Sequence, residues 1–261
     1  MGESDGLGLS LRAALIVLAA LLAGDALIVA LYLDYVRTAQ GAPTPLALHN
    51  PTFLLSLDGG LAERLEYLKS MLTAAVLFRL ASHGGGRLFL ALAGVHAWFL
   101  ADNLLKLHER AGRLLGQLLA PDGALTLASR DFGEFMAFGA IGAGLALQLW
   151  LCWRKADAGQ RRAGGLLIFT AGSLVLFATV ADALHASRLG PLLGETFWVL
   201  LEDGGETLVL SLNCALAAGF AVAAGVRFWP APAAATPHGA AEASRGKMTR
   251  QTRLGRTAFL R

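Results

Sequence analysis

Residues 181–213 read ADALHASRLGPLLGETFWVLLEDGGETLVLSLN, and this stretch determines the fold that we expect for the whole chain. An apolar run ends in Asp182 and His185, a short loop follows with Gly190 and Pro191, and a second apolar run opens with acidic residues. Glycine and proline punctuate the turns between helices, so the stretch predicts a helical hairpin with its ionisable groups at one end. The rest of the chain repeats this arrangement.

The composition is that of a membrane protein. Of the 261 residues, 55% are hydrophobic and 16% are charged, and the mean hydropathy is +0.55. Soluble domains carry about 25% charged residues. Long uncharged runs between short loops therefore predict an all-α polytopic membrane helix bundle, with the lipid bilayer as its partner and no nucleic acid. A water-soluble protein of buried helices is the alternative.

Six transmembrane helices are predicted, and they form one domain that covers residues 1–229. The first could instead be a cleaved signal peptide, although its flank lacks the usual basic start. Residues 230–261 are rich in alanine and proline and then basic, which predicts a disordered tail. The predicted spans lie at about 13–33, 61–82, 88–100, 132–153, 165–185 and 197–228.

Charge is distributed unequally between the two sides. The loops 2–3 and 4–5 carry six Lys and Arg residues, opposed by Asp157 alone. By the positive-inside rule, this places both termini in the cytoplasm of a bacterial inner membrane. Arg outnumbers Lys by 18 to 4, which fits a GC-rich bacterial genome. Fourteen of the 19 acidic residues fall on the opposite, outer side, where five helix ends meet.

Carboxylates and imidazoles at these helix ends predict a divalent metal site. Asp182 and His185 are three residues apart, a spacing that lets two side chains share one ion. Such donors suit Zn, Mn or Fe, or Ca where the histidines stand apart, and the lack of soft ligands argues against copper. The predicted ligands are His108, Glu109, Asp182, His185, Glu202 and Glu206, and the candidate bases are Glu66, Asp102 and Glu134.

A plainer interpretation remains open. The acidic residues could lie among lipid headgroups or pair with basic neighbours such as Lys69 and Lys106. Asp25, near the middle of the first span, should face protein rather than lipid, because a charge in the bilayer is costly. His96 is expected to be a hydrogen-bonded core residue. Asp102 and Glu109 are seven residues apart, about 20° off one face of a continuous helix.

Two motifs carry a resemblance to known families. Asp-x5-His-Glu at Asp102–Glu109 and LEDGGE at 201–206 resemble uncharacterised bacterial multipass membrane proteins, and this resemblance implies no activity. Ceramidase-like intramembrane hydrolases also place Asp and His at helix ends around zinc. Their paired histidines, four apart on one helix, are absent here, so that likeness is distant.

Three functions follow from these features. The first is a metal-dependent membrane hydrolase that acts on a lipid-like or periplasmic substrate, with a metal-activated water and a carboxylate base. The second is a cation or proton transporter or channel, lined by Asp25 and by the stripe Glu202, Glu206 and Asn213. A non-catalytic membrane scaffold is the third.

Overall fold

The computed structural model describes residues 8–119, 127–181, 184 and 194–226, with side chains at these positions except 119, 127–131, 178 and 179. The chain divides into a unit of residues 1–226 and a second unit of residues 227–261. All described residues belong to the first unit. The predicted tail, residues 230–261, therefore lies outside them.

Every regular element in the described ranges is a helix, which confirms the all-α prediction. Three short helical turns supplement the longer helices: η1 (Pro51–Phe53), η2 (Ala81–Gly85) and η3 (Leu176–Ala181). The longer helices are α1 (Leu11–Ala39), α2 (Leu61–Leu80), α3 (Gly86–Leu105), α4 (Leu107–Leu119), α5 (Leu127–Trp153), α6 (Ala158–Val175) and α9 (Glu195–Ala223).

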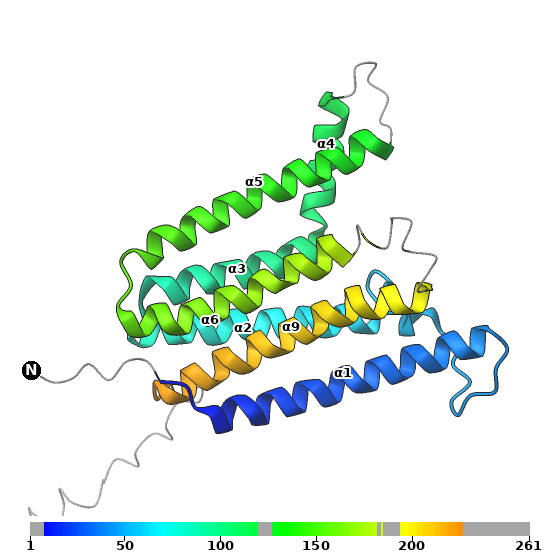
Figure 1. Ribbon diagram of the computed structural model, residues 1–261, viewed down its shortest axis with the longest axis horizontal. Coiled ribbons are helices and arrows are strands. Elements are labelled where there is room, and N and C mark those ends of the chain that lie inside the picture. The colour runs from blue at the N-terminus through cyan, green and yellow to red at the C-terminus, as the bar shows by residue number, and fades with distance from the viewer. Residues whose placement is uncertain (1–7, 120–126, 182–183, 185–193, 227–261) are drawn as a thin grey trace, which may run out of the picture. The chain divides into compact units, whose positions relative to one another are not determined.

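Four helical stretches in the described part of the chain are long and apolar enough to cross a membrane: Leu11–Ala39, Leu61–Leu105, Phe132–Trp153 and Glu195–Ala223. These stretches fit a protein that resides in a lipid bilayer. The second stretch reverses direction at Gly84 and Gly86, where φ is positive, so that α2 and α3 lie side by side (Figure 1). The predicted number of six spans stays a prediction.

Helix α9 is the central element of this bundle. It packs along α1, α2 and α6 (Figure 1). Of its apolar segment of 18 residues, 67% is buried, whereas 6% of the corresponding segment of α5 is buried. The start of α1 is fixed to the end of α9 by a hydrogen bond of 3.0 Å from the Ser10 N–H to the Gly219 carbonyl. Helix α5 lies at the periphery, against α4 and α3.

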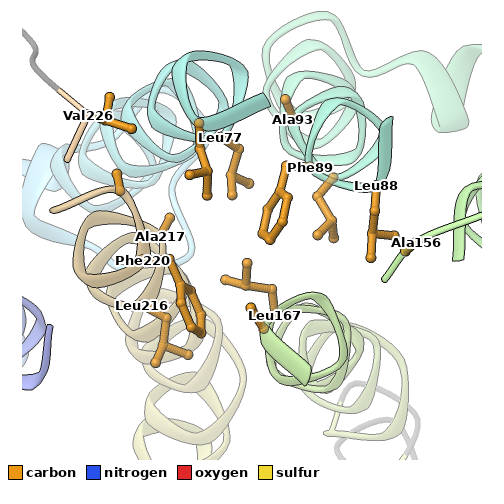
Figure 2. Close-up of a cluster of buried hydrophobic side chains, with 14 residues drawn as sticks. Leu77, Leu88, Phe89, Ala93, Ala156, Leu167, Leu216, Ala217, Phe220 and Val226 are labelled. Atoms are coloured by element: carbon orange, nitrogen blue, oxygen red, sulfur yellow. The ribbon is translucent and has the colours of Figure 1, made fainter. Parts of the chain in front are cut away.

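One end of the bundle has an apolar core. Leu77, Phe89, Leu167 and Phe220, from α2, α3, α6 and α9, point toward one another there, and each is at most 4% exposed (Figure 2). Arg79, Arg87, Arg154 and Lys155 occur where these helices begin or end, so we call this the basic end. The opposite end, where α3 ends and α2 and α9 begin, is the acidic end.

The continuous helix that we predicted beyond residue 100 is wrong. Lys106 adopts a left-handed conformation with φ of 51°, which ends α3 at Leu105, and α4 starts in a new direction and packs along α5 (Figure 1). Asp102 and Glu109 therefore do not share the face of one helix. A left-handed backbone conformation is uncommon for residues other than glycine, and no sequence pattern here predicts it.

Candidate functional site

A cavity of about 760 Å³ opens at the acidic end. Residues of the loop before α2, of α2 to α6 and of α9 form its walls. Lys106 and His108 are the basic side chains among its described lining residues. Nine carboxylates line it: Asp58, Glu63, Glu66, Asp102, Glu109, Glu134, Glu202, Asp203 and Glu206.

A buried ion pair lies beside this cavity, in the middle of the bundle. Lys69 of α2 is fully buried, and its ammonium group is 2.5 Å from a carboxylate oxygen of Asp25 in α1. The same ammonium donates to the Thr207 carbonyl at 3.0 Å, and Ser211 donates to the other oxygen of Asp25 at 2.6 Å. Asp25 thus faces protein, as predicted, and the pair joins α1, α2 and α9.

Two further carboxylates lie between α2 and α9. Glu66 is 7% exposed and accepts a hydrogen bond of 2.6 Å from the Thr207 hydroxyl. Glu206, one residue before Thr207, lines the cavity with Glu66 and is close enough for their charges to repel. No cation or hydrogen-bond donor among the described residues is paired with Glu206.

Asp102 and His108 form a dyad on the cavity wall. The carboxylate accepts from the His108 N–H at 2.8 Å, which satisfies an amide at the start of α4, and its second oxygen is 2.8 Å from Nδ1 of the imidazole. That side-chain hydrogen bond raises the pKa of His108 above its ordinary value. The ring also meets Phe138 of α5 edge to face, with 6.0 Å between centroids.

Lys106 is engaged by carboxylates at the mouth of the cavity. Its ammonium is 2.6 Å from Asp58 and 3.4 Å from Glu109. Burial lowers the pKa of Lys106, but the two carboxylates outweigh this effect and the net pKa is raised. The plainer interpretation of paired charges therefore holds for Asp58 and Glu109.

His96 lies deeper in the bundle and is fully buried on α3. Neither ring nitrogen has a hydrogen-bond partner of normal geometry in the part of the chain that the structure describes, although Asn213 lies close to the ring. Asn213 is itself satisfied, since its amide oxygen accepts from Thr170 at 3.0 Å and its nitrogen donates to the Val209 carbonyl at 3.2 Å. His96 is therefore a core residue, as expected, but the expected hydrogen bond is not found among the described residues.

The LEDGGE motif owes one of its glycines to packing. A Cβ atom at Gly205 would lie 2.3 Å from the Phe177 ring of η3, whereas a Cβ at Gly204 would meet nothing within 4 Å. Only glycine permits η3 to approach α9 this closely. The motif therefore supplies both the close contact between α9 and η3 and the three carboxylates Glu202, Asp203 and Glu206.

The structure brings together all the predicted site residues that it describes. Asp182 and His185 lie outside the described residues. No group of three or more His, Cys, Asp and Glu side chains in the described ranges is arranged to hold a metal ion, so the ligand set stays a prediction. The residues that line the cavity are His108, Glu109, Glu202 and Glu206, predicted as ligands, and Glu66, Asp102 and Glu134, predicted as bases.

Sequence reasoning missed three residues of the buried network, namely Lys69, Thr207 and Ser211. From the sequence alone, Lys69 was interpreted only as a basic neighbour that neutralises acidic residues near the lipid headgroups. A signal was present, because Asp203, Thr207 and Ser211 repeat every four residues and so follow one face of α9. The contact from Lys69 to Asp25 spans 44 residues, and no local spacing reports it.

The fold and the site together define an all-helical protein whose apolar helices suit a bilayer, with an acidic cavity beside a buried ion pair. The chain belongs to the family described as Domain of unknown function (DUF8692), whose model matches residues 14–220. No curated protein and no solved structure matches it. That description assigns no activity, so the likeness to ceramidase-like hydrolases stays a prediction.

Proposed function

We propose that this protein moves protons or exchanges them for another cation across a membrane, with Glu66 and Glu206 as the proton-binding groups. The single observation that carries the proposal is the excess of carboxylates over cations among α1, α2 and α9, where Asp25 and Glu66 are buried and Glu206 is half-buried. Lys69 is bound to Asp25, and among the described residues Glu66 has only the Thr207 hydroxyl as its partner.

Charge balance explains why protons would bind there. If Asp25, Glu66 and Glu206 were all ionised, Lys69 would neutralise one of the three charges. An unneutralised carboxylate held away from water costs several kcal/mol, so the group takes up a proton or attracts a cation. A proton requires a single carboxylate, whereas a metal ion requires several donors converging within bonding distance.

The arrangement also offers a connection between cavity and membrane interior. The cavity reaches Glu66, and Thr207 joins Glu66 through its hydroxyl and Lys69 through its carbonyl. A change of protonation at Glu66 would therefore act on the ion pair that holds α1, α2 and α9 together. Transport through coupled carboxylates and a lysine is a common role of ionisable groups inside membranes.

The proposed location is a bacterial inner membrane, with both termini in the cytoplasm and the cavity open to the outer side. The support is the excess of Lys and Arg in the short loops at the basic end. This orientation would let the acidic cavity attract cations from the more acidic outer compartment.

Proton flux into proteoliposomes tests the proposal. The purified full chain is reconstituted, a pH gradient is applied, and a trapped pH-sensitive dye follows the internal pH. We expect flux that Glu206→Gln and Glu66→Gln each reduce to the level of empty liposomes. Glu195→Gln is the matched control, because Glu195 lies on α9 and outside the cavity. Flux that is unchanged by Glu206→Gln would overturn the proposal.

The Asp102–His108 dyad supports the metal-dependent hydrolase as a second candidate. A carboxylate on Nδ1 holds the imidazole in the orientation in which Nε2 can take a proton from water. His108 would then be the base, in place of the carboxylates that we predicted. A bound divalent metal would supply an activated water, and Glu202 and Glu206, which were predicted as ligands, line the same cavity.

Elemental analysis of the detergent-purified protein separates the two candidates. A catalytic metal site predicts Zn, Mn or Fe in near-stoichiometric amount. Less than about a tenth of an equivalent would rule out the hydrolase and leave the proton proposal in place. Asp182→Ala and His185→Ala should each lower the metal content if these residues are ligands.

A further inference from the structure

The cavity at the acidic end is far larger than a proton path requires. Its volume of about 760 Å³ falls in the range of pockets for small organic molecules. A single water occupies about 30 Å³ of liquid, so this space is large enough for many waters or for one small organic molecule.

Part of the cavity lining is apolar. Phe99 of α3 and Phe138 of α5 supply aromatic rings, and Leu174 and Leu210 add aliphatic surface from α6 and α9. The carboxylates described above make up the charged part of the lining. A ligand that fits both would have an apolar body and a positive charge, and aromatic faces add an attraction for cations.

Ser70 is a second, independent indication of a ligand. Its side chain lies on α2 one turn after Glu66, is 3% exposed and lines the cavity. No hydrogen bond joins its hydroxyl to another described residue, and the hydroxyl oxygen is open to the cavity rather than sealed in the core. A polar group that is buried against the cavity and left without a protein partner suits contact with a bound molecule.

We infer that the cavity binds an amphiphilic organic cation, such as an ammonium or phosphonium group with apolar substituents, as the substrate exchanged for protons. The inference rests on the proposed proton transport, and it adds the chemical class of the second substrate. Glu206 and Glu66 would exchange a bound proton for the organic cation, so that the cavity holds either one. The rings of Phe99 and Phe138 would contact its apolar part.

Binding of tetraphenylphosphonium to the detergent-purified full chain tests this inference by equilibrium dialysis. Tetraphenylborate has the same shape with the opposite charge, and tetramethylammonium has the charge without the apolar body. We expect saturable binding of tetraphenylphosphonium, with proton release in weak buffer, and no binding of tetraphenylborate. The affinity for tetramethylammonium should be lower by about tenfold or more. Equal binding of tetraphenylborate would overturn the inference, as would uptake no greater than that of empty micelles.

Two variants assign the binding to this cavity. Glu206→Gln removes charge and Phe138→Ala removes the aromatic wall, and each should weaken tetraphenylphosphonium binding by about tenfold. Glu195→Gln should leave the affinity unchanged. Retained gel-filtration profiles show that the variants are folded, and the Phe138 variant decides the matter if the Glu206 variant does not fold. Unchanged affinity in the folded variants would overturn the inference.

The two proposals fail in different ways. If proton flux depends on Glu206 but tetraphenylphosphonium does not bind, the inference about the substrate is wrong and the proton proposal stands. If tetraphenylphosphonium binds in the cavity but releases no protons and no flux is found, the proton proposal is wrong.

Discussion

The two ends of the bundle are built from the same helices by different means. At the basic end, α2 and α9 contribute Leu77 and Phe220 to a close-packed apolar core (Figure 2). Toward the acidic end, the same helices contribute Lys69 and Thr207 to a few directional hydrogen bonds beside a large cavity. One end is filled and the other is hollow.

This difference separates stability from chemistry. The hydrophobic effect that drives apolar burial is non-directional, whereas hydrogen bonds between buried charges require fixed geometry and lose their value when one partner leaves. We therefore expect the basic end to set the helix positions and the acidic end to respond to protons and ligands. Four predictions test this division, in order of decreasing effect.

Replacement of Lys69 should have the largest effect. Lys69→Met leaves Asp25 buried without its cation, and breaking a buried pair costs about 3–5 kcal/mol. The measurement is the free energy of unfolding in mixed detergent micelles. Lys155→Met, an exposed lysine at the basic end, is the control and should change it by less than about 0.5 kcal/mol.

The double variant Asp25→Leu with Lys69→Met makes this prediction sharper. It removes both charges, and replacing a whole buried pair by apolar groups is often nearly neutral. We expect it to recover most of the stability that Lys69→Met loses, while proton flux stays absent. A double variant as unstable as the single one would show that the pair contributes through its hydrogen bonds to Thr207 and Ser211 instead.

Leu77→Ala probes the filled end. The side chain is fully buried, and removing its methyl groups leaves a void that costs about 2–5 kcal/mol. Leu72→Ala on the same helix is the control, because Leu72 is 40% exposed at the outer surface of the bundle. The division between the ends predicts that folded Leu77→Ala protein keeps its proton flux. Flux lost in parallel with stability would contradict it.

Gly205→Ala tests the close contact between η3 and α9. The added methyl group would collide with the Phe177 ring, and overpacking of this kind costs about 1–3 kcal/mol. Gly204→Ala adds the same group in open space and should be neutral or stabilising by about 0.5–1 kcal/mol, because alanine favours a helix. Thermal unfolding midpoints of the two variants provide the measurement. Equal midpoints would show that η3 shifts freely away from α9.

The sequence was sufficient for the helical class and for the gathering of carboxylates at one end. Apolar period and turn residues are local signals. Because successive helices run in opposite directions, acidic residues at the end of one helix and at the start of the next fall at the same end of the bundle. The position of Asp25 was also predictable, since a charge inside an apolar helix has to face protein.

The pairing of that charge was not predictable. Lys69 lies in the least apolar half of α2, which suggested a headgroup location, yet it is fully buried, because α1 and α9 cover it. The turn at Lys106 was not predicted, for another reason. The residues around it, Leu105 and Leu107, continue an apolar helical pattern. The left-handed conformation occurs together with the hydrogen bond from the His108 N–H to Asp102 and the ion pair of Lys106 with Asp58, which that pattern does not report.

The smallest effect is expected at the Asp102–His108 dyad. The hydrogen bond from Asp102 raises the pKa of His108 in the folded protein above the value of about 6.5 that an unfolded chain gives it. The fold therefore favours the protonated imidazole. Its contribution to stability is complete below the unfolded pKa and is lost as the pH rises through the folded pKa.

Asp102→Asn keeps an oxygen for the His108 N–H but removes the charge that holds the imidazolium. We expect it to destabilise the protein by about 1 kcal/mol or less, since the imidazole is partly exposed, and only on the acidic side of a range from about pH 5 to pH 8. Unfolding of wild type and variant at several pH values measures the effect, and the histidine proton resonances report the pKa directly. Because the dyad borders the cavity and lies outside the apolar core, Leu77→Ala should leave the pKa of His108 unchanged. A loss of stability that is the same at every pH, or greater at high pH, would show that Asp102 acts through the α4 amide alone.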